Sequence, residues 1–369
     1  MDPRVRRMAE VLVGYSLAVK PGESVLIRGP IAAEALMVEL TRAVLRAGGN
    51  PTTWFQSENI AEMLLNEGSD DQLRYLAPSA PLMFEQSDAM IRLLAPDNTE
   101  AFAGIDPAKT VLQQKSLEPM METMFRRTSE GNLRWSVAQY PTQAAAQDAG
   151  MSLRCYEDFV YGAGLLNEPD PVAAWRKFGE RQQRLVEWIS TKSDVHISGS
   201  GTDLTIGIAG RIWKQDDGHI NFPGGEIFTG PIEDSAEGTI QFAYPALYNG
   251  QQVSGVRLRF EKGAVVEATA TEHEEYLLEM LALDDGAKRL GELAFGTNRN
   301  IIEPTKNTLF DEKIGGTLHM ALGRSYPETG GMNVSALHWD MVYNLRDGAE
   351  VWVDGQLFSK NGEFQPLFP

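Results

Sequence analysis

The stretch "ESVLIRGPIAAEALMVELTRAVLRAGG", residues 23–49, decides the fold of the first half of the chain. Its first seven residues are a short apolar run, as in a buried strand. Its apolar positions then recur at helical spacing until Gly48 and Gly49 end the pattern. A second strand pattern follows at 51–56 and a helical pattern at 60–77. Strands that alternate with helices in this way predict an open, mostly parallel sheet with helices on both faces.

The same rhythm continues outward from this stretch. Further strands are predicted at 89–95 and 133–142, and a long helix at 170–191 closes this half. Residues 5–19 read as the first helix and not as a signal peptide, because Glu10 interrupts the apolar run and no small-residue cleavage site follows. The first strand is not followed by G-x-G-x-x-G, so a dinucleotide site is not expected.

After Lys192 the pattern changes to strands that alternate with Gly- and Asp-rich turns, which predicts antiparallel hairpins. One helix is predicted at 272–290, with Thr271 as its cap, and a closing hairpin at 349–364 turns at Asp354-Gly355. The sequence therefore predicts two domains, an α/β domain over 1–190 and an α+β domain over 191–369.

Composition excludes several classes of protein. The net charge of −18 and the lack of a Lys/Arg cluster argue against nucleic-acid binding. The sequence also contains no run of 18 apolar residues, the length needed to span a membrane. The single cysteine, Cys155, rules out an internal disulfide and a thiolate metal cluster, which fits a cytoplasmic protein. Any metal must therefore be held by His, Asp and Glu.

The second half concentrates the residues that could bind such a metal. In "ALHWDMVYNL" (336–345) a strand would place His338 and Asp340 on one face and apolar side chains on the other. His319 lies in a further strand pattern, Glu226 follows Pro-Gly-Gly, and Glu292 is flanked by apolar residues and glycines. Taken one at a time, these residues could equally be a His–Asp pair on a sheet, a core histidine, a turn glutamate and an edge-strand glutamate.

Taken together, several motifs resemble, in order, those of the thermophilic aminopeptidase family of metallopeptidases, which includes aminopeptidases T and S. The resemblance covers most of the chain and is strongest from Pro223 onward. The motifs are "WSVAQYPTQAAAQDAGMS" (135–152), "NFPGGEIFTGP" (221–231), "LGELAFGTNRNI" (290–301), "EKIGGTLHMALGRSYP" (312–327) and "HWDMV" (338–342).

The resemblance implies a leucyl aminopeptidase-like hydrolase that removes N-terminal residues from peptides with the help of two divalent ions (Zn, Co or Mn). It also implies a homodimer. The loop 327–337 looks shorter than in the best-known members, which bears on substrate preference. The implied catalytic residue is Tyr326, with Glu226 or Glu292 as a candidate general base, and the implied metal ligands are Glu226, Glu292, His319, His338 and Asp340.

Two other functions stay open at this point. Ring-cleaving dihydroxypyridine dioxygenases resemble the same fold family but hold one iron with two histidines and an aspartate, here His319, His338 and Asp340. Glu226 and Glu292 would then have no role. The remaining alternative is a metal-free binding protein, which the complete ligand set disfavours.

Overall fold

The computed structural model of the protein describes residues 2–365. The chain forms two compact units. The first runs to Trp175 and also takes in Gly218–Pro223, and the second comprises Arg176–Asp217 and the chain from Gly224 onward. The division lies within α10 (Pro171–Ile189), whose Leu185 and Ile189 belong to the apolar core of the second unit. The predicted domain boundary near residue 190, with two parts that fold independently, therefore stays a prediction.

The first unit is built on a five-stranded sheet in the order β2-β1-β3-β4-β8, with every pair parallel. The predicted strands are present, and a fifth comes from the returning segment, because Val137 N donates to Ile220 O at 2.8 Å. The strands are β1 (Ser24–Pro30), β2 (Asn50–Gln56), β3 (Ala89–Leu94), β4 (Arg134–Gln139) and β8 (Asn221–Phe222).

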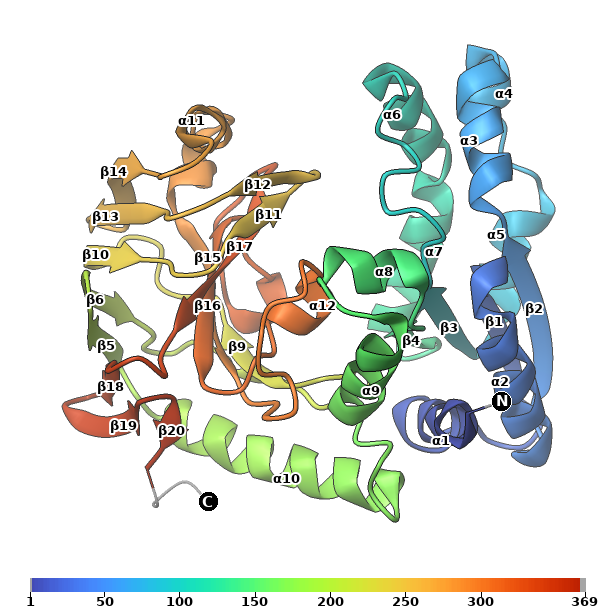
Figure 1. Cartoon of the computed structure of the whole chain (residues 1–369), viewed down its shortest axis with the longest axis horizontal. Coiled ribbons are helices and arrows are strands. Elements are labelled where there is room, and N and C mark those ends of the chain that lie inside the picture. Colours follow the sequence, from blue (N-terminus) through green and yellow to red (C-terminus); the bar gives the residue numbers. More distant parts are fainter. Residues whose placement is uncertain (1, 366–369) are drawn as a thin grey trace. The chain divides into compact units, whose positions relative to one another are not determined.

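Helices flank this sheet (Figure 1). Phe84 on α5 and Met120 and Met124 on α7 form a buried cluster with Leu26 and Met90 of the sheet. The helices of this unit are α1 (Pro3–Val11), α2 (Glu34–Arg46), α3 (Glu58–Glu67), α4 (Asp70–Arg74), α5 (Ser79–Gln86), α6 (Pro107–Ser116), α7 (Glu118–Ser129), α8 (Gln143–Asp148) and α9 (Leu153–Ala163).

One predicted helix of this unit, 60–77, is two helices, so the prediction of a single helix was wrong. Gly68 adopts an extended conformation after α3, and Ser69 then opens α4 through a capping box with Gln72. The capping signal starts a new helix where apolar periodicity alone suggested continuity.

The second unit contains an eight-stranded sheet in the order β14-β13-β10-β6-β5-β18-β19-β20, a five-stranded sheet in the order β17-β16-β15-β9-β7, and the hairpin β11-β12. All strand pairs in the first two sheets are antiparallel, as predicted. Outside the five-stranded sheet, the strands are β5 (Asp194–Gly199), β6 (Thr202–Gly207), β10 (Glu237–Gln241), β11 (Ala246–Tyr248), β12 (Gln251–Val253), β13 (Arg257–Glu261), β14 (Ala264–Thr269), β18 (Glu350–Val353), β19 (Gln356–Lys360) and β20 (Glu363–Phe364).

The fold class predicted from sequence is therefore confirmed, as is the closing hairpin. Asp354 and Gly355 turn it with φ of 47° and 74°, the left-handed conformation that a two-residue hairpin requires. The predicted helix at 272–290 is wrong in length, because α11 (Glu274–Leu281) stops early. Thr271 does not cap it, because the N-cap position is occupied by His273, whose side chain makes no capping hydrogen bond.

Within residues 2–365, no helix is both long enough and apolar enough to cross a membrane.

Candidate metal centre

The candidate site lies on one face of the antiparallel five-stranded sheet of the second unit. Its strands are β7 (Lys214–Asp216), β9 (Glu226–Thr229), β15 (Leu290–Gly296), β16 (Thr317–Gly323) and β17 (His338–Asn344). Strand side chains alternate between faces. The apolar set points into the core of the unit and consists of Leu293, Phe295, Leu318, Met320, Leu322, Trp339 and Met341.

The strand register places all five predicted ligands on the other face. Ala321 lies opposite both Glu292 and Asp340, because residues that pair across antiparallel strands share a face. The other cross-strand partners are Ala294 and Val342 opposite His319, Gly323 opposite His338, and Gly296 and Asp216 opposite Glu226. Most of the residues beside the long polar side chains are therefore Ala or Gly, which leaves room above the sheet.

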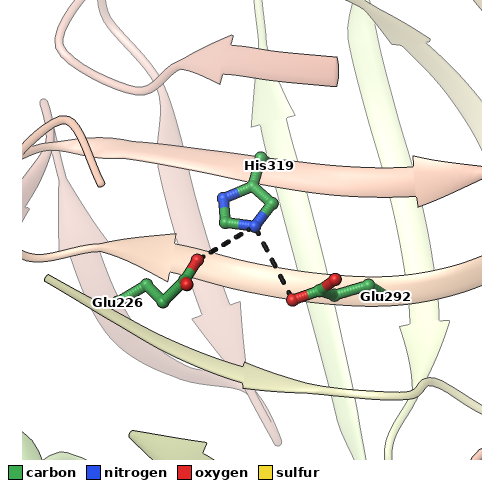
Figure 2. A group of neighbouring side chains, drawn as sticks. All are labelled: Glu226, Glu292 and His319. Carbon is green, nitrogen blue, oxygen red and sulfur yellow. Dashed lines mark ion pairs between the residues drawn. The ribbon is translucent and has the colours of Figure 1, made fainter. Parts of the chain in front are cut away.

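The first group of side chains joins β9, β15 and β16. His319 Nε2 lies 3.2 Å from Glu226 Oε2 and 3.7 Å from Glu292 Oε1 (Figure 2). All three residues are buried. Their ligand atoms lie within 4.8 Å of one another, close enough to hold one ion. The interpretations of Glu226 as an exposed turn residue and of Glu292 as an edge-strand residue are both wrong.

The second group joins β15 and β17. His338 Nε2 lies 3.4 Å from Glu292 Oε2 and 3.6 Å from Asp340 Oδ1. His338 Nδ1 must carry a proton, because it donates to Arg324 O at 2.8 Å. Such a bond orients a ligating imidazole and directs Nε2 at the ion. Glu292 belongs to both groups, with one oxygen near each histidine.

The titration of these groups follows from their contacts. Burial raises the pKa of Glu292, but hydrogen bonds from His319 and His338 outweigh burial and lower its pKa to about 2. Burial lowers the pKa of His338, yet its bond to Glu292 and the charge of Asp340 raise it to about 9. Although burial raises the pKa of Glu226, the nearby Lys313 and His319 bring it below its ordinary value. Without a metal, protons on the imidazoles balance the carboxylates.

The donor set fits a divalent cation. Glu226 Oε2 and Asp340 Oδ1 are buried, and neither accepts a hydrogen bond within residues 2–365. A buried carboxylate oxygen that accepts no hydrogen bond is unfavourable even where a histidine nitrogen faces it, as His319 Nε2 faces Glu226 Oε2 at 3.2 Å, and a coordinated ion would remove that cost. Three carboxylates and two imidazoles without sulfur suit Zn, Co or Mn.

Tyr326 stands beside the second group, on the loop after β16. Its hydroxyl lies 3.4 Å from His338 Nε2, and its ring meets Phe228 edge-on. Burial raises the pKa of this phenol, and the negative charges of Glu292 and Asp340 raise it further. Tyr326 therefore keeps its proton at neutral pH and remains a hydrogen-bond donor.

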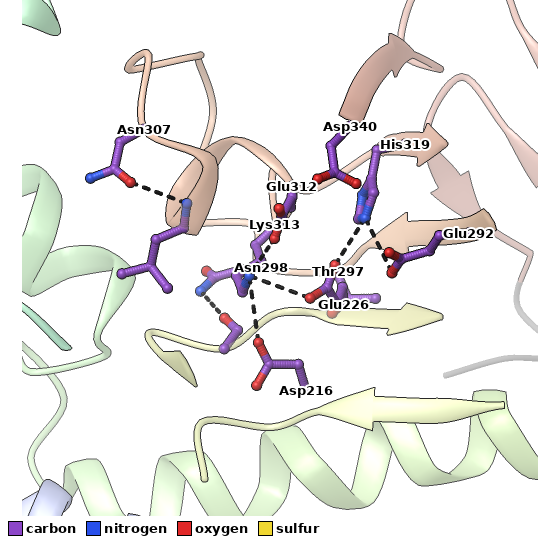
Figure 3. A network of polar contacts seen from close by, with 12 residues as sticks. Asp216, Glu226, Glu292, Thr297, Asn298, Asn307, Glu312, Lys313, His319 and Asp340 are labelled. Carbon is purple, nitrogen blue, oxygen red and sulfur yellow. Dashed lines mark hydrogen bonds and ion pairs between the residues drawn. The ribbon is translucent and has the colours of Figure 1, made fainter. Parts of the chain in front are cut away.

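Sequence reasoning missed a second layer of charged residues behind Glu226. Lys313 is fully buried, and its Nζ faces carboxylates of Asp216, Glu226 and Glu312 (Figure 3). Lys313 lies in a short loop between α12 (Thr308–Asp311) and β16, where no periodicity marks burial. Asp216 pairs with Glu226 across β7 and β9, a register that only the folded sheet reveals.

A small open hollow with a volume of about 30 Å³ adjoins the second group. Asp340 forms part of its wall, together with carboxyl groups from the segment around α12 and apolar side chains from β11 and β17. It is lined by Pro245, Leu247, Lys306, Thr308, Asp311, Glu312, Asp340 and Val342.

Two His/carboxylate groups that share one carboxylate form a donor set typical of a metalloenzyme. Residues 1–364 match the model of the thermophilic metalloprotease family (M29), and the chain belongs to this family. It is therefore an enzyme of the metal-dependent peptide hydrolase class, which confirms the resemblance inferred from the motifs.

Two named relatives are similar to this chain along nearly the full length of both proteins. Aminopeptidase 2 of Geobacillus stearothermophilus is 26% identical over 411 residues, covering 100% of this chain and 97% of that protein. Aminopeptidase T of Thermus thermophilus is 27% identical, covering 99% and 94%.

Two solved structures share the fold. The wild-type AmpT structure from Thermus thermophilus superposes with a TM-score of 0.83 at 24% identity, covering 98% of this chain and 99% of that one. A 2,5-dihydroxypyridine dioxygenase from Pseudomonas putida superposes with a TM-score of 0.62 at 15% identity, covering 99% and 98%. The fold therefore accommodates both enzyme classes weighed from sequence, and the site has to separate them.

Proposed function

We propose that this protein is a metal-dependent aminopeptidase with a dinuclear centre, in which Glu292 would be the ligand shared by the two metal positions. One observation carries the proposal: two three-residue ligand groups lie side by side and share Glu292. Glu226 and His319 complete one position, and His338 and Asp340 complete the other. The metal could be Zn, Co or Mn.

The proposed roles follow from the donor chemistry. Paired divalent ions would polarise a peptide carbonyl and supply a nucleophile from water near neutral pH. Tyr326 would donate its phenolic proton in a hydrogen bond to the developing oxyanion. We assign Glu226 and Glu292 as metal ligands, because an oxygen of each lies within 4 Å of His319 Nε2 in the first group, and either glutamate stays a candidate general base.

Recognition of a free N-terminus is supported by the hollow next to Asp340. Its wall carries the carboxyl group of Asp311, which suits an α-ammonium group, whereas Glu312 is already paired with Lys313. The names of the relatives point to the same substrates. We therefore propose peptides with a free N-terminus as substrates. A cytoplasmic homodimer as the working form is proposed from the family resemblance alone.

The second candidate is the iron dioxygenase, favoured only by the shared fold. It would use His319, His338 and Asp340 and leave Glu226 and Glu292 without a role. Both glutamates are instead buried within 4 Å of a histidine, an arrangement that supports the aminopeptidase.

The test is hydrolysis by the purified protein supplied with Co²⁺, Zn²⁺ or Mn²⁺. We expect release of N-terminal residues from short peptides and cleavage of leucyl chromogenic amides, but no cleavage of the N-acetylated counterparts. EDTA should abolish turnover, and a thiol reagent should not, because Cys155 is a free, exposed residue outside the site. Equal cleavage of free and blocked peptides would exclude the aminopeptidase.

A further inference from the structure

Lys313 is a fully buried cation in contact with a candidate metal ligand. Its Nζ lies 3.1 Å from Glu312 Oε2, 3.3 Å from Glu226 Oε1 and 3.5 Å from Asp216 Oδ2 (Figure 3). A buried ammonium is stable only when such partners replace its hydration. The candidate metal ligands and Tyr326 account for the proposed reaction without Lys313, so its presence here needs a separate explanation.

The backbone fixes Lys313 relative to the site strands. Lys313 N donates to Phe310 O at 2.9 Å, and Asn298 N donates to Lys313 O at 3.1 Å. Asn298 follows β15 by two residues and also donates through Nδ2 to Gly224 O at 3.0 Å, next to the start of β9. The backbone of Lys313 is therefore tied to the segments that flank both strands supplying the glutamates of the first group.

Lys313 and His319 face different oxygens of the same carboxylate. Lys313 contacts Oε1 of Glu226, whereas Oε2 faces His319 Nε2 at 3.2 Å and accepts no hydrogen bond within residues 2–365. A contact on one oxygen restricts rotation of the carboxylate and leaves the other oxygen free for coordination. Groups that orient a ligand in this way contribute strongly to metal affinity.

We propose that Lys313 is a positioning residue that makes Glu226 a one-oxygen ligand and thereby forms the metal position of Glu226, Glu292 and His319. This inference rests on the metal-binding part of the proposed function, but not on the identity of the substrate. The competing explanation is that Lys313 only balances the charge of Asp216 and Glu312.

A charge-balanced variant separates the two explanations. Lys313→Met combined with Asp216→Asn removes one positive and one negative charge, so the net charge of the cluster is unchanged while Glu226 Oε1 loses its partner. If this double variant does not fold, the double variant Lys313→Leu with Asp216→Leu replaces it, because buried ion pairs often tolerate apolar replacement. The same change in metal binding is expected for it. Lys360→Met is the matched control, since Lys360 forms an ion pair with Glu350 at 2.8 Å on the surface.

The measurement is a cobalt titration of the metal-free proteins. Calorimetry and the visible absorption of bound Co²⁺ monitor the binding. We expect the folded double variant to bind one ion like the wild type and the other about 10–100-fold more weakly, while Lys360→Met matches the wild type. If the double variant binds Co²⁺ as tightly as the wild type or more tightly, whatever the number of ions bound, Lys313 does not have the proposed role. A wild-type chain that binds fewer than two ions instead contradicts the dinuclear centre itself.

Discussion

The two faces of the five-stranded sheet are made by the same strands and have opposite chemistry. On β17, Trp339 and Met341 point into the apolar core, while His338 and Asp340 point to the candidate metal centre. Both faces are largely buried, so they differ in how burial is compensated. The apolar face is stabilised by removal of side chains from water. The polar face needs a cation opposite each carboxylate.

It follows from this difference that the stability of the fold and the metal-binding properties of the site can be changed separately in this sheet. Neighbouring residues of one strand belong to different networks, because strand side chains alternate. A substitution on one face should therefore leave the other face largely intact.

The largest expected effect comes from the apolar face. Phe295 is fully buried, packs edge-on against Phe358 and stacks on Trp213. Phe295→Ala should lower the free energy of unfolding by about 3–5 kcal/mol through lost burial and a cavity. Metal content per folded chain should stay at the wild-type value. Chemical denaturation and elemental analysis measure the two quantities, and loss of metal with unchanged stability would contradict the separation of faces.

The next effect belongs to the polar face. Tyr326→Phe removes only the hydroxyl near His338, so kcat should fall by roughly 10²–10³, as for other single oxyanion donors. KM and metal content should change little, because the loss is confined to the transition state. Stability should change by no more than about 1 kcal/mol. A variant with wild-type kcat would show that the ring only packs against Phe228.

A smaller effect is the pH dependence of the metal-free protein. The pKa of His338 is about 9 in the folded chain against an ordinary value of 6.5, so the folded state keeps this proton longer than the unfolded state. The resulting stabilisation is fully present below pH 6.5 and is lost as pH rises through 9, by about 3 kcal/mol at most.

Denaturation of EDTA-treated protein between pH 6 and 10 measures this loss. Saturating metal should remove it, because coordination requires the unprotonated imidazole. A His338→Gln variant that keeps the same decline would assign the effect to other groups.

Much of the fold was predictable because local patterns and final structure agree. The alternation in 336–345 correctly separated His338 and Asp340 from Trp339, and Asp354-Gly355 correctly marked a hairpin. The strand at Asn221–Phe222 was not predictable, because it joins the parallel sheet through a pairing with β4 that is remote in sequence.

The site was predictable only where family motifs supplemented the local pattern. Glu292 looked like a possible edge residue, yet β15 is central and buried along its whole length. Lys313 gave no signal, because a lysine before Ile-Gly-Gly usually marks an exposed loop. Its burial depends on Asp216 and Glu226, which three-dimensional packing brings to it.

The central claim is that Glu292 is the ligand shared by two metal positions, and metal content per chain tests it most directly. The wild type saturated with Zn, Co or Mn should retain two ions. Because Glu292 belongs to both groups and Asp340 to one, Glu292→Gln should weaken both positions and Asp340→Asn only one. Retention of a single iron by the wild type, or loss of one ion only in Glu292→Gln, would contradict the account.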